Sequence, residues 1–99
     1  MSLLNISAYA ARKSPVFTTT WDCKSIISGS RELCDSWDCK AIVDRNSLLC
    51  DTWDCKSIIS GNSETCDTWD CKAIVSGNSD ICDSWDCKAV VAKNPDLCD

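Results

Sequence analysis

The sequence predicts an all-α fold, a disulfide-stapled solenoid of five 16-residue repeats of short helices with an N-terminal helical cap. Three observations indicate this class: a Trp-Asp-Cys-Lys signature that recurs at a strict interval, helix start and stop signals at the same places in each repeat, and 10 cysteines in 99 residues. A chain of this size buries only about 60 to 65% of its unfolded surface, so covalent cross-links are expected.

Residues 1–13 are expected to form an N-terminal capping or assembly segment. Alanines and then basic residues occupy positions 8–13, and this composition favours helix over strand. The next stretch, 14–20, matches the second half of a repeat, except that Thr18 stands where each repeat has a cysteine. The array therefore begins with a degenerate half unit.

The repeat array spans 14–99, and each full repeat contains two expected short helices. The first follows the Trp-Asp-Cys-Lys signature and stops at a turn, where Gly29, Gly61 and Gly77 can adopt the left-handed conformation that ends helices. The second begins after this turn, because Ser or Asn stands at an N-cap position and an acid follows in four of the five repeats. The repeats are anchored at Trp21, Trp37, Trp53, Trp69 and Trp85.

A β-solenoid with one 16-residue coil per repeat is the alternative fold. Residues 36–43 nearly alternate between polar and apolar side chains, and β-branched residues end the run. An in-register stack, however, would place like charges directly above one another, and its narrow coil would have to accommodate a tryptophan. The helical repeat is therefore favoured.

The cysteines are expected to form five structural disulfides, each across ten intervening residues. Pairing residues five apart would need too long a bridge in an uninterrupted helix or strand, and it would leave Cys23 and Cys98 without partners. The predicted pairs are Cys23–Cys34, Cys39–Cys50, Cys55–Cys66, Cys71–Cys82 and Cys87–Cys98. Metal or redox thiols are the alternative, although the chain has no histidine and no Cys-x2-Cys pair.

The cysteine content indicates an extracellular or other oxidising compartment. The first residues have no basic leading region, so no signal peptide and no membrane span are expected, and the route to such a compartment stays open. The net charge of −5 argues against nucleic acid as a partner. No nucleophile motif, no phosphate-binding loop and no distinct reactive site is present, so we expect neither an enzyme nor a cofactor.

The five tryptophans are expected to form a core stack, because an aromatic residue repeated at this period is usually internal. An exposed row that binds glycans is the alternative. The column Thr20, Ser36, Thr52, Thr68 and Ser84 offers weaker support for ice binding.

Two aspartates bracket each later tryptophan. Asp38 and its equivalents are expected to cap the helix that follows, and Asp35 and its equivalents to lie in solvent. Calcium binding is the alternative, but no EF-hand or comparable glycine pattern surrounds these residues.

The expected function is that of a structural repeat protein, a rigid rod that associates head to tail into a filament. Asp99 ends the array in mid-repeat, so the C-terminal face is expected to be unfinished, while the N-terminal segment is apolar. The assembly residues would be Leu3, Leu4, Ile6, Leu97 and Asp99. The alternative is a module that uses one face of the array to bind a protein or a glycan.

Overall fold

The structure, a computed structural model, describes residues 20–99. These residues contain helices and no strand, so the predicted all-α class is confirmed for this part of the chain and the β-coil alternative is wrong there. The cap predicted at 1–13 and the first six residues of the half unit lie outside the described residues. Among the described helices, none combines the length and the apolar character needed to cross a bilayer.

Each repeat contributes one α-helix and one short 3-10 helix. The α-helices are α2 (Thr20–Ser28), α3 (Trp37–Asp44), α4 (Trp53–Ser60), α5 (Trp69–Ser76) and α6 (Trp85–Ala92). The 3-10 helices are η1 (Arg31–Leu33), η2 (Ser47–Leu49), η3 (Ser63–Thr65), η4 (Ser79–Ile81) and η5 (Pro95–Leu97).

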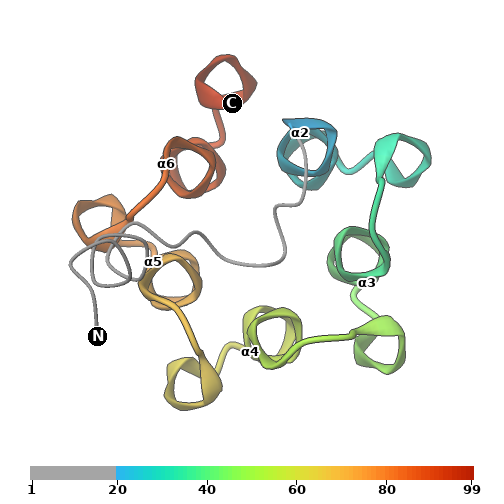
Figure 1. Cartoon of the computed structure of the whole chain (residues 1–99), viewed down its shortest axis with the longest axis horizontal. Coiled ribbons are helices and arrows are strands. Elements are labelled where there is room, and N and C mark those ends of the chain that lie inside the picture. Colours follow the sequence, from blue (N-terminus) through green and yellow to red (C-terminus); the bar gives the residue numbers. More distant parts are fainter. Residues whose placement is uncertain (1–19) are drawn as a thin grey trace, which may run out of the picture.

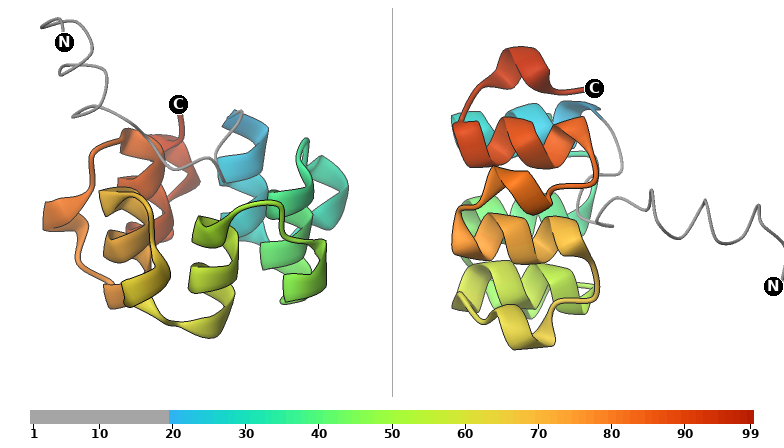
Figure 2. Two further views of the ribbon diagram at one scale, coloured as in Figure 1. Left: turned by 60° about the horizontal axis from the view of Figure 1, so that its bottom comes forward. Right: turned by 90° about the vertical axis from the view of Figure 1, so that its left-hand side faces the viewer.

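The repeats form a closed ring. The α-helices lie side by side around a centre and run roughly parallel, and the 3-10 helices lie outside them (Figures 1 and 2). Each α-helix contacts the next one along the chain, and α6 contacts α2, as does η5. The first repeat therefore covers the C-terminal face of the last repeat, which the sequence predicts to be unfinished.

Hydroxyl side chains begin the α-helices. The N-cap residue has an extended backbone, and its oxygen accepts a hydrogen bond from the backbone N–H three residues later, as Thr52 does from Cys55 at 3.2 Å. Ser36, Thr68 and Ser84 make the same bond. Asparagine is the N-cap of four 3-10 helices, and its side chain accepts a hydrogen bond from the backbone N–H two residues later. These residues are Asn46, Asn62, Asn78 and Asn94. Ser30, the N-cap of η1, makes no such side-chain bond.

A left-handed residue ends each α-helix. Gly29, Gly61 and Gly77 have φ between +74° and +76°, which confirms the stop signals predicted at these glycines. Arg45 and Lys93 occupy the same position in the other two repeats, with φ of +55° and +57°. This conformation is unfavourable for a residue with a side chain, so two of the five helix ends carry backbone strain.

Small and polar side chains fill the interior between the helices, and the tryptophans do not. Ala41, Ala73 and Ala89 are fully buried, and Ile and Val side chains pack partly buried against them. The largest fully buried side chains are Asp22, Asp54, Asp70, Asp86, Cys23, Cys39, Cys55, Cys71 and Cys87. Disulfides and buried carboxylates therefore take the place of a large apolar core.

We predict opposite effects of two substitutions at the helix ends. Gly61→Ala should lower the free energy of unfolding by about 1 kcal/mol, because a Cβ there meets nothing within 4 Å and only the backbone conformation opposes it. Arg45→Gly should raise it by about 0.5 to 1 kcal/mol, because glycine adopts this conformation freely. Urea unfolding measures both. Gly61→Asn is the matched control and should lose less than Gly61→Ala, since asparagine tolerates positive φ; equal losses for the two would contradict the backbone explanation.

Candidate functional site

All ten cysteines are paired, in bridges that differ from the predicted ones. The pairs are Cys34–Cys39, Cys50–Cys55, Cys66–Cys71, Cys82–Cys87 and Cys23–Cys98. The five-residue pairs form because the chain is neither a continuous helix nor a continuous strand there. It is extended at Cys50 and Thr52 and turns into a helix at Trp53, and this change of direction brings the Cα atoms of Cys50 and Cys55 to 5.6 Å.

The two cysteines that this pairing would leave over bond to each other. Cys23 in α2 and Cys98 after η5 are 75 residues apart in sequence, with Cα atoms 5.9 Å apart. The bridge occupies the place in the ring that the four local bridges occupy between their own repeats. It is thus the covalent closure of the ring, and five disulfides are consistent with an oxidising, extracellular environment.

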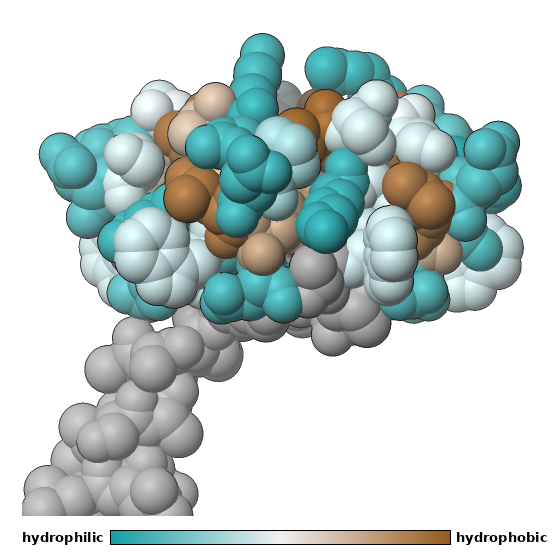
Figure 3. All heavy atoms as spheres, turned by 90° about the horizontal axis from the view of Figure 1, so that it is seen from above, coloured by the Kyte–Doolittle hydropathy of each residue, from teal (hydrophilic) through white to brown (hydrophobic). Residues whose placement is uncertain are grey.

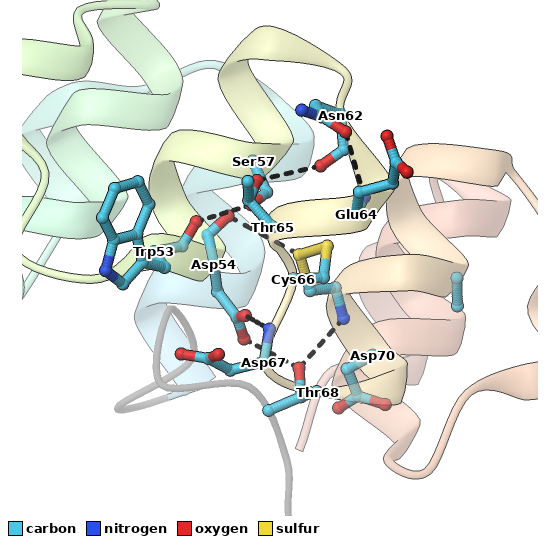
Figure 4. Close-up of a disulfide and its surroundings, with 12 residues drawn as sticks. Trp53, Asp54, Ser57, Asn62, Glu64, Thr65, Cys66, Asp67, Thr68 and Asp70 are labelled. Atoms are coloured by element: carbon cyan, nitrogen blue, oxygen red, sulfur yellow. Dashed lines mark hydrogen bonds between the residues drawn. A yellow bond between two sulfur atoms is a disulfide. The ribbon is translucent and has the colours of Figure 1, made fainter.

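A buried aspartate links each α-helix to the beginning of the next one. In Figure 4, Asp54 of α4 accepts hydrogen bonds from the backbone N–H of Asp67 and from the hydroxyl of Thr68, each at 2.7 Å. Thr68 is the N-cap of α5 and accepts from the N–H of Cys71 at 3.1 Å. A single carboxylate therefore fixes the backbone before α5 and orients the hydroxyl that caps it.

The same carboxylate link recurs around the ring. Asp38 accepts from the N–H of Asp51 and from the hydroxyl of Thr52, both at 2.6 Å. Asp70 accepts from Asp83 and Ser84. Asp22 accepts from the N–H of Asp35, and Asp86 from the N–H of Asp99, each at 2.7 Å.

These links correct one expectation. The buried aspartates do not cap their own helices, because the residue two positions earlier is the N-cap and the carboxylate turns towards the next repeat. In the hydroxyl column considered for ice binding, Thr52, Thr68 and Ser84 donate their hydroxyls to carboxylates. The aspartates before the four N-caps are exposed, as predicted: Asp35, Asp51, Asp67 and Asp83.

Sulfur and carboxylate atoms lie close together in every repeat. One carboxylate oxygen and two sulfurs lie within 4.8 Å of one another in each group, as for Asp54, Cys66 and Cys71. Both sulfurs are bonded to each other, so they are not thiolate ligands for a metal in this redox state. One sulfur of each pair also lies 3.6 to 3.7 Å from the carbonyl oxygen of the preceding repeat's aspartate, including across the seam from Cys23 to Asp86.

The tryptophans are exposed, which makes the predicted core stack wrong. Trp21, Trp37, Trp53, Trp69 and Trp85 keep between 53% and 58% of their surface in solvent. Each tryptophan lies on the same side of its α-helix as the lysine three residues later and the residue seven later. That side faces outward, while helices that approach through alanines, disulfides and aspartates leave no room between them for an indole.

Each tryptophan lies beneath a lysine, and around Trp85 the pair lines a groove. The lysine ammonium is 4.5 to 5.4 Å from the indole centroid in all five repeats, within the range of a cation–π contact. The groove has a volume of about 360 Å³ and is lined by Ser79, Asp80, Trp85, Lys88, Ala92 and Leu97. Figure 3 shows hydrophobic groups on one face of the molecule separated by hydrophilic ones.

The residues predicted to drive assembly have different places. Leu97 is partly buried and lines the groove at Trp85, and the N–H of Asp99 is bonded to Asp86. Leu3, Leu4 and Ile6 lie outside the described residues. The described end of the array is thus bonded within its own ring.

We predict that the ring-closing disulfide contributes more stability than a local one. Loop-closure entropy gives about 4.5 kcal/mol for a 75-residue loop and about 2 kcal/mol for a five-residue loop. Cys23→Ala/Cys98→Ala should therefore lower the denaturant midpoint more than Cys50→Ala/Cys55→Ala. Mass spectrometry of a non-reduced digest checks the pairing itself, and a peptide that links Cys23 to Cys34 would refute the closed ring.

We predict a large effect of removing one linking hydroxyl. Thr68→Val leaves the N–H of Cys71 and one oxygen of Asp54 without this hydroxyl in a buried site, which should cost about 2 kcal/mol of unfolding free energy. Thr68→Ser is the matched control and should stay within about 0.5 kcal/mol, because serine does this work at position 84. Equal melting curves for the two variants would show that the hydroxyl is not needed.

No protein-family model matches the chain, no curated protein is similar to it and no solved structure matches it. The exposed tryptophan–lysine pairs and the groove at Trp85 are therefore the features from which a function can be inferred.

Proposed function

We propose that this chain is a non-enzymatic binding module that holds oligosaccharides against the tryptophan–lysine pairs of its outer wall, one of which lines the groove at Trp85. The single observation that carries the proposal is the exposure of five tryptophans in equivalent positions, each more than half in solvent. Large exposed aromatics are uncommon on a small monomeric domain, and they mark binding surfaces more often than isolated aliphatic residues do.

The chemistry of the groove suits a sugar. An indole offers a flat apolar surface for the C–H face of a sugar ring, and Ser79, Asp80 and Lys88 around Trp85 offer a hydroxyl, a carboxylate and an ammonium to its hydroxyl groups. Lys88 lies 4.6 Å from the indole centroid, so it must move aside or bridge to the ligand when a sugar stacks there. A side chain held by an exposed cation–π contact, worth about 0.5 to 1 kcal/mol, moves at little cost.

The repetition of the tryptophan–lysine pair favours a repeating ligand. One such pair makes few contacts and is expected to bind weakly. A ligand that reaches two or more pairs on the same rigid ring gains about 10² to 10⁴ in apparent affinity, provided its units match the spacing. A polysaccharide supplies such repeating units, whereas an isolated monosaccharide does not.

A filament is the less supported role. Head-to-tail growth requires an uncovered C-terminal face on the array. Within one chain, α2 and the disulfide at Cys98 cover that face. An enzyme is also not proposed, because the reactive groups of residues 20–99 recur in every repeat instead of forming one distinct site.

The test follows the five indole N–H resonances by NMR during titration with oligosaccharides of increasing length. We expect several indole signals to shift together, with an affinity that rises by at least tenfold from a disaccharide to a chain that spans two pairs. The variant with all five tryptophans replaced by alanine should lose binding and keep the helical circular dichroism spectrum, because the indoles are not in the core.

The matched control is Leu48→Ala, which removes an exposed apolar side chain outside the described groove. It should leave the affinity unchanged. A folded wild-type ring whose indole signals respond to no member of a broad panel of neutral and acidic glycans would refute the proposal.

A further inference from the structure

A second cavity lies near the C-terminal ends of the helices and shares no residue with the groove at Trp85. It has a volume of about 400 Å³, and its lining comes from three successive helices of the ring, α6, α2 and α3. Ile26, Ile27, Ile42, Val43 and Val90 form its apolar wall. Because α6 and α3 flank α2 on either side, a space that all three line lies on the inner side of α2, in the centre of the ring (Figure 1). We refer to it as the central hollow.

Two cations border the central hollow at strained positions. Lys93 ends α6 and Arg45 ends α3, and both line the cavity with Gly29, which ends α2 between them. A Cβ built on Gly29 meets nothing within 4 Å, so the space beside this glycine is open. On the other side of the ring, glycines end α4 and α5.

Strain distinguishes these cations from ordinary helix-end residues. A basic residue near a C-terminus interacts favourably with the helix dipole, and it does so from the last turn without needing a positive φ. Glycine fits the terminal position better, and three of the five repeats have it. Strained backbone positions often cluster at ligand sites, and here two of them carry a cation beside one cavity.

We propose that the central hollow binds a free single-chain amphipathic anion, such as a medium-chain alkyl carboxylate. Its apolar chain would lie against Ile26, Ile42 and Val90, and its head group between Arg45 and Lys93. The volume is in the lower part of the range for small-molecule sites, which suits one short chain and not a branched lipid.

The charges around the mouth of the hollow determine where the head group can lie. The α-helices end there with negative partial charge, which disfavours an anion inside the ring. The carboxylate of Asp44, next to Arg45, lies 2.7 Å from the guanidinium of Arg31. The negative charge of Asp44 is therefore paired with Arg31 and not with Arg45. The anion is therefore placed at the rim, where Arg45 and Lys93 are exposed, and only its apolar part enters.

Titration calorimetry with decanoate tests the proposal on the oxidised wild-type chain. We expect saturable binding of one decanoate per chain below the micelle concentration, with methyl NMR shifts at Ile26, Ile42 and Val90. Decanol, which has the same chain without the charge, should bind at least tenfold more weakly. Arg45→Gly/Lys93→Gly should also bind decanoate at least tenfold more weakly and unfold at a higher denaturant concentration than the wild type.

The combination of a more stable fold and a lost ligand separates binding from structural damage. Lys72→Gln, on the outer wall over Trp69, is the charge control and should keep the decanoate affinity within twofold. Absence of saturable binding, equal binding of decanol, or unchanged affinity in the double glycine variant would each overturn the proposal. Loss of glycan binding at the tryptophan–lysine pairs would not affect it, because the two sites share no residue.

Discussion

The fold depends on a buried carboxylate that belongs to one helix and organises the beginning of the next. Asp54 is an example: its two carboxylate oxygens accept hydrogen bonds from the N–H of Asp67 and the hydroxyl of Thr68. The oxygen of that hydroxyl accepts a hydrogen bond from the N–H of Cys71. A buried charge is unfavourable unless several donors compensate it. Here the donors come from the next repeat, so a repeat satisfies its own carboxylate only by packing against its neighbour.

The contact between neighbouring repeats makes an open end unfavourable. In an open array no further helix would pack against the last repeat, and the side of α6 that contacts α2 would stay in water. In the ring α6 lies beside α2 instead, while the backbone N–H of Asp99 bonds to Asp86 as Asp67 bonds to Asp54. The disulfide from Cys98 to Cys23 then fixes covalently the same neighbour relation that the hydrogen bonds favour. Closure thus repeats, between the last repeat and the first, the contact that successive repeats make.

The sequence was sufficient for the helices and insufficient for their arrangement. Glycine stops, asparagine N-caps and the all-α class follow from local rules, and they are confirmed in residues 20–99. The disulfides depend on the angle between η and α segments, which spacing alone does not reveal. Pairing cysteines five residues apart leaves Cys23 and Cys98 over, one at each end of the array. These two leftover cysteines are the signal in the sequence that the ring closes. The predicted core stack of tryptophans is wrong because the size of an indole favours burial, whereas the side of the helix that it shares with the lysine three residues later faces outward.

The polar interior explains why the large aromatic residues lie on the outside. A ring of five helices that meet through alanine, cysteine and aspartate brings the backbones close, and disulfides supply stability that a small chain cannot obtain from apolar burial alone. The interior then has no need of indoles. Their outward position leaves apolar surface in contact with water, and the stability of the fold does not depend on this surface. Surface that stability does not explain is where a ligand is expected, and in this ring the repeat provides it five times in equivalent surroundings.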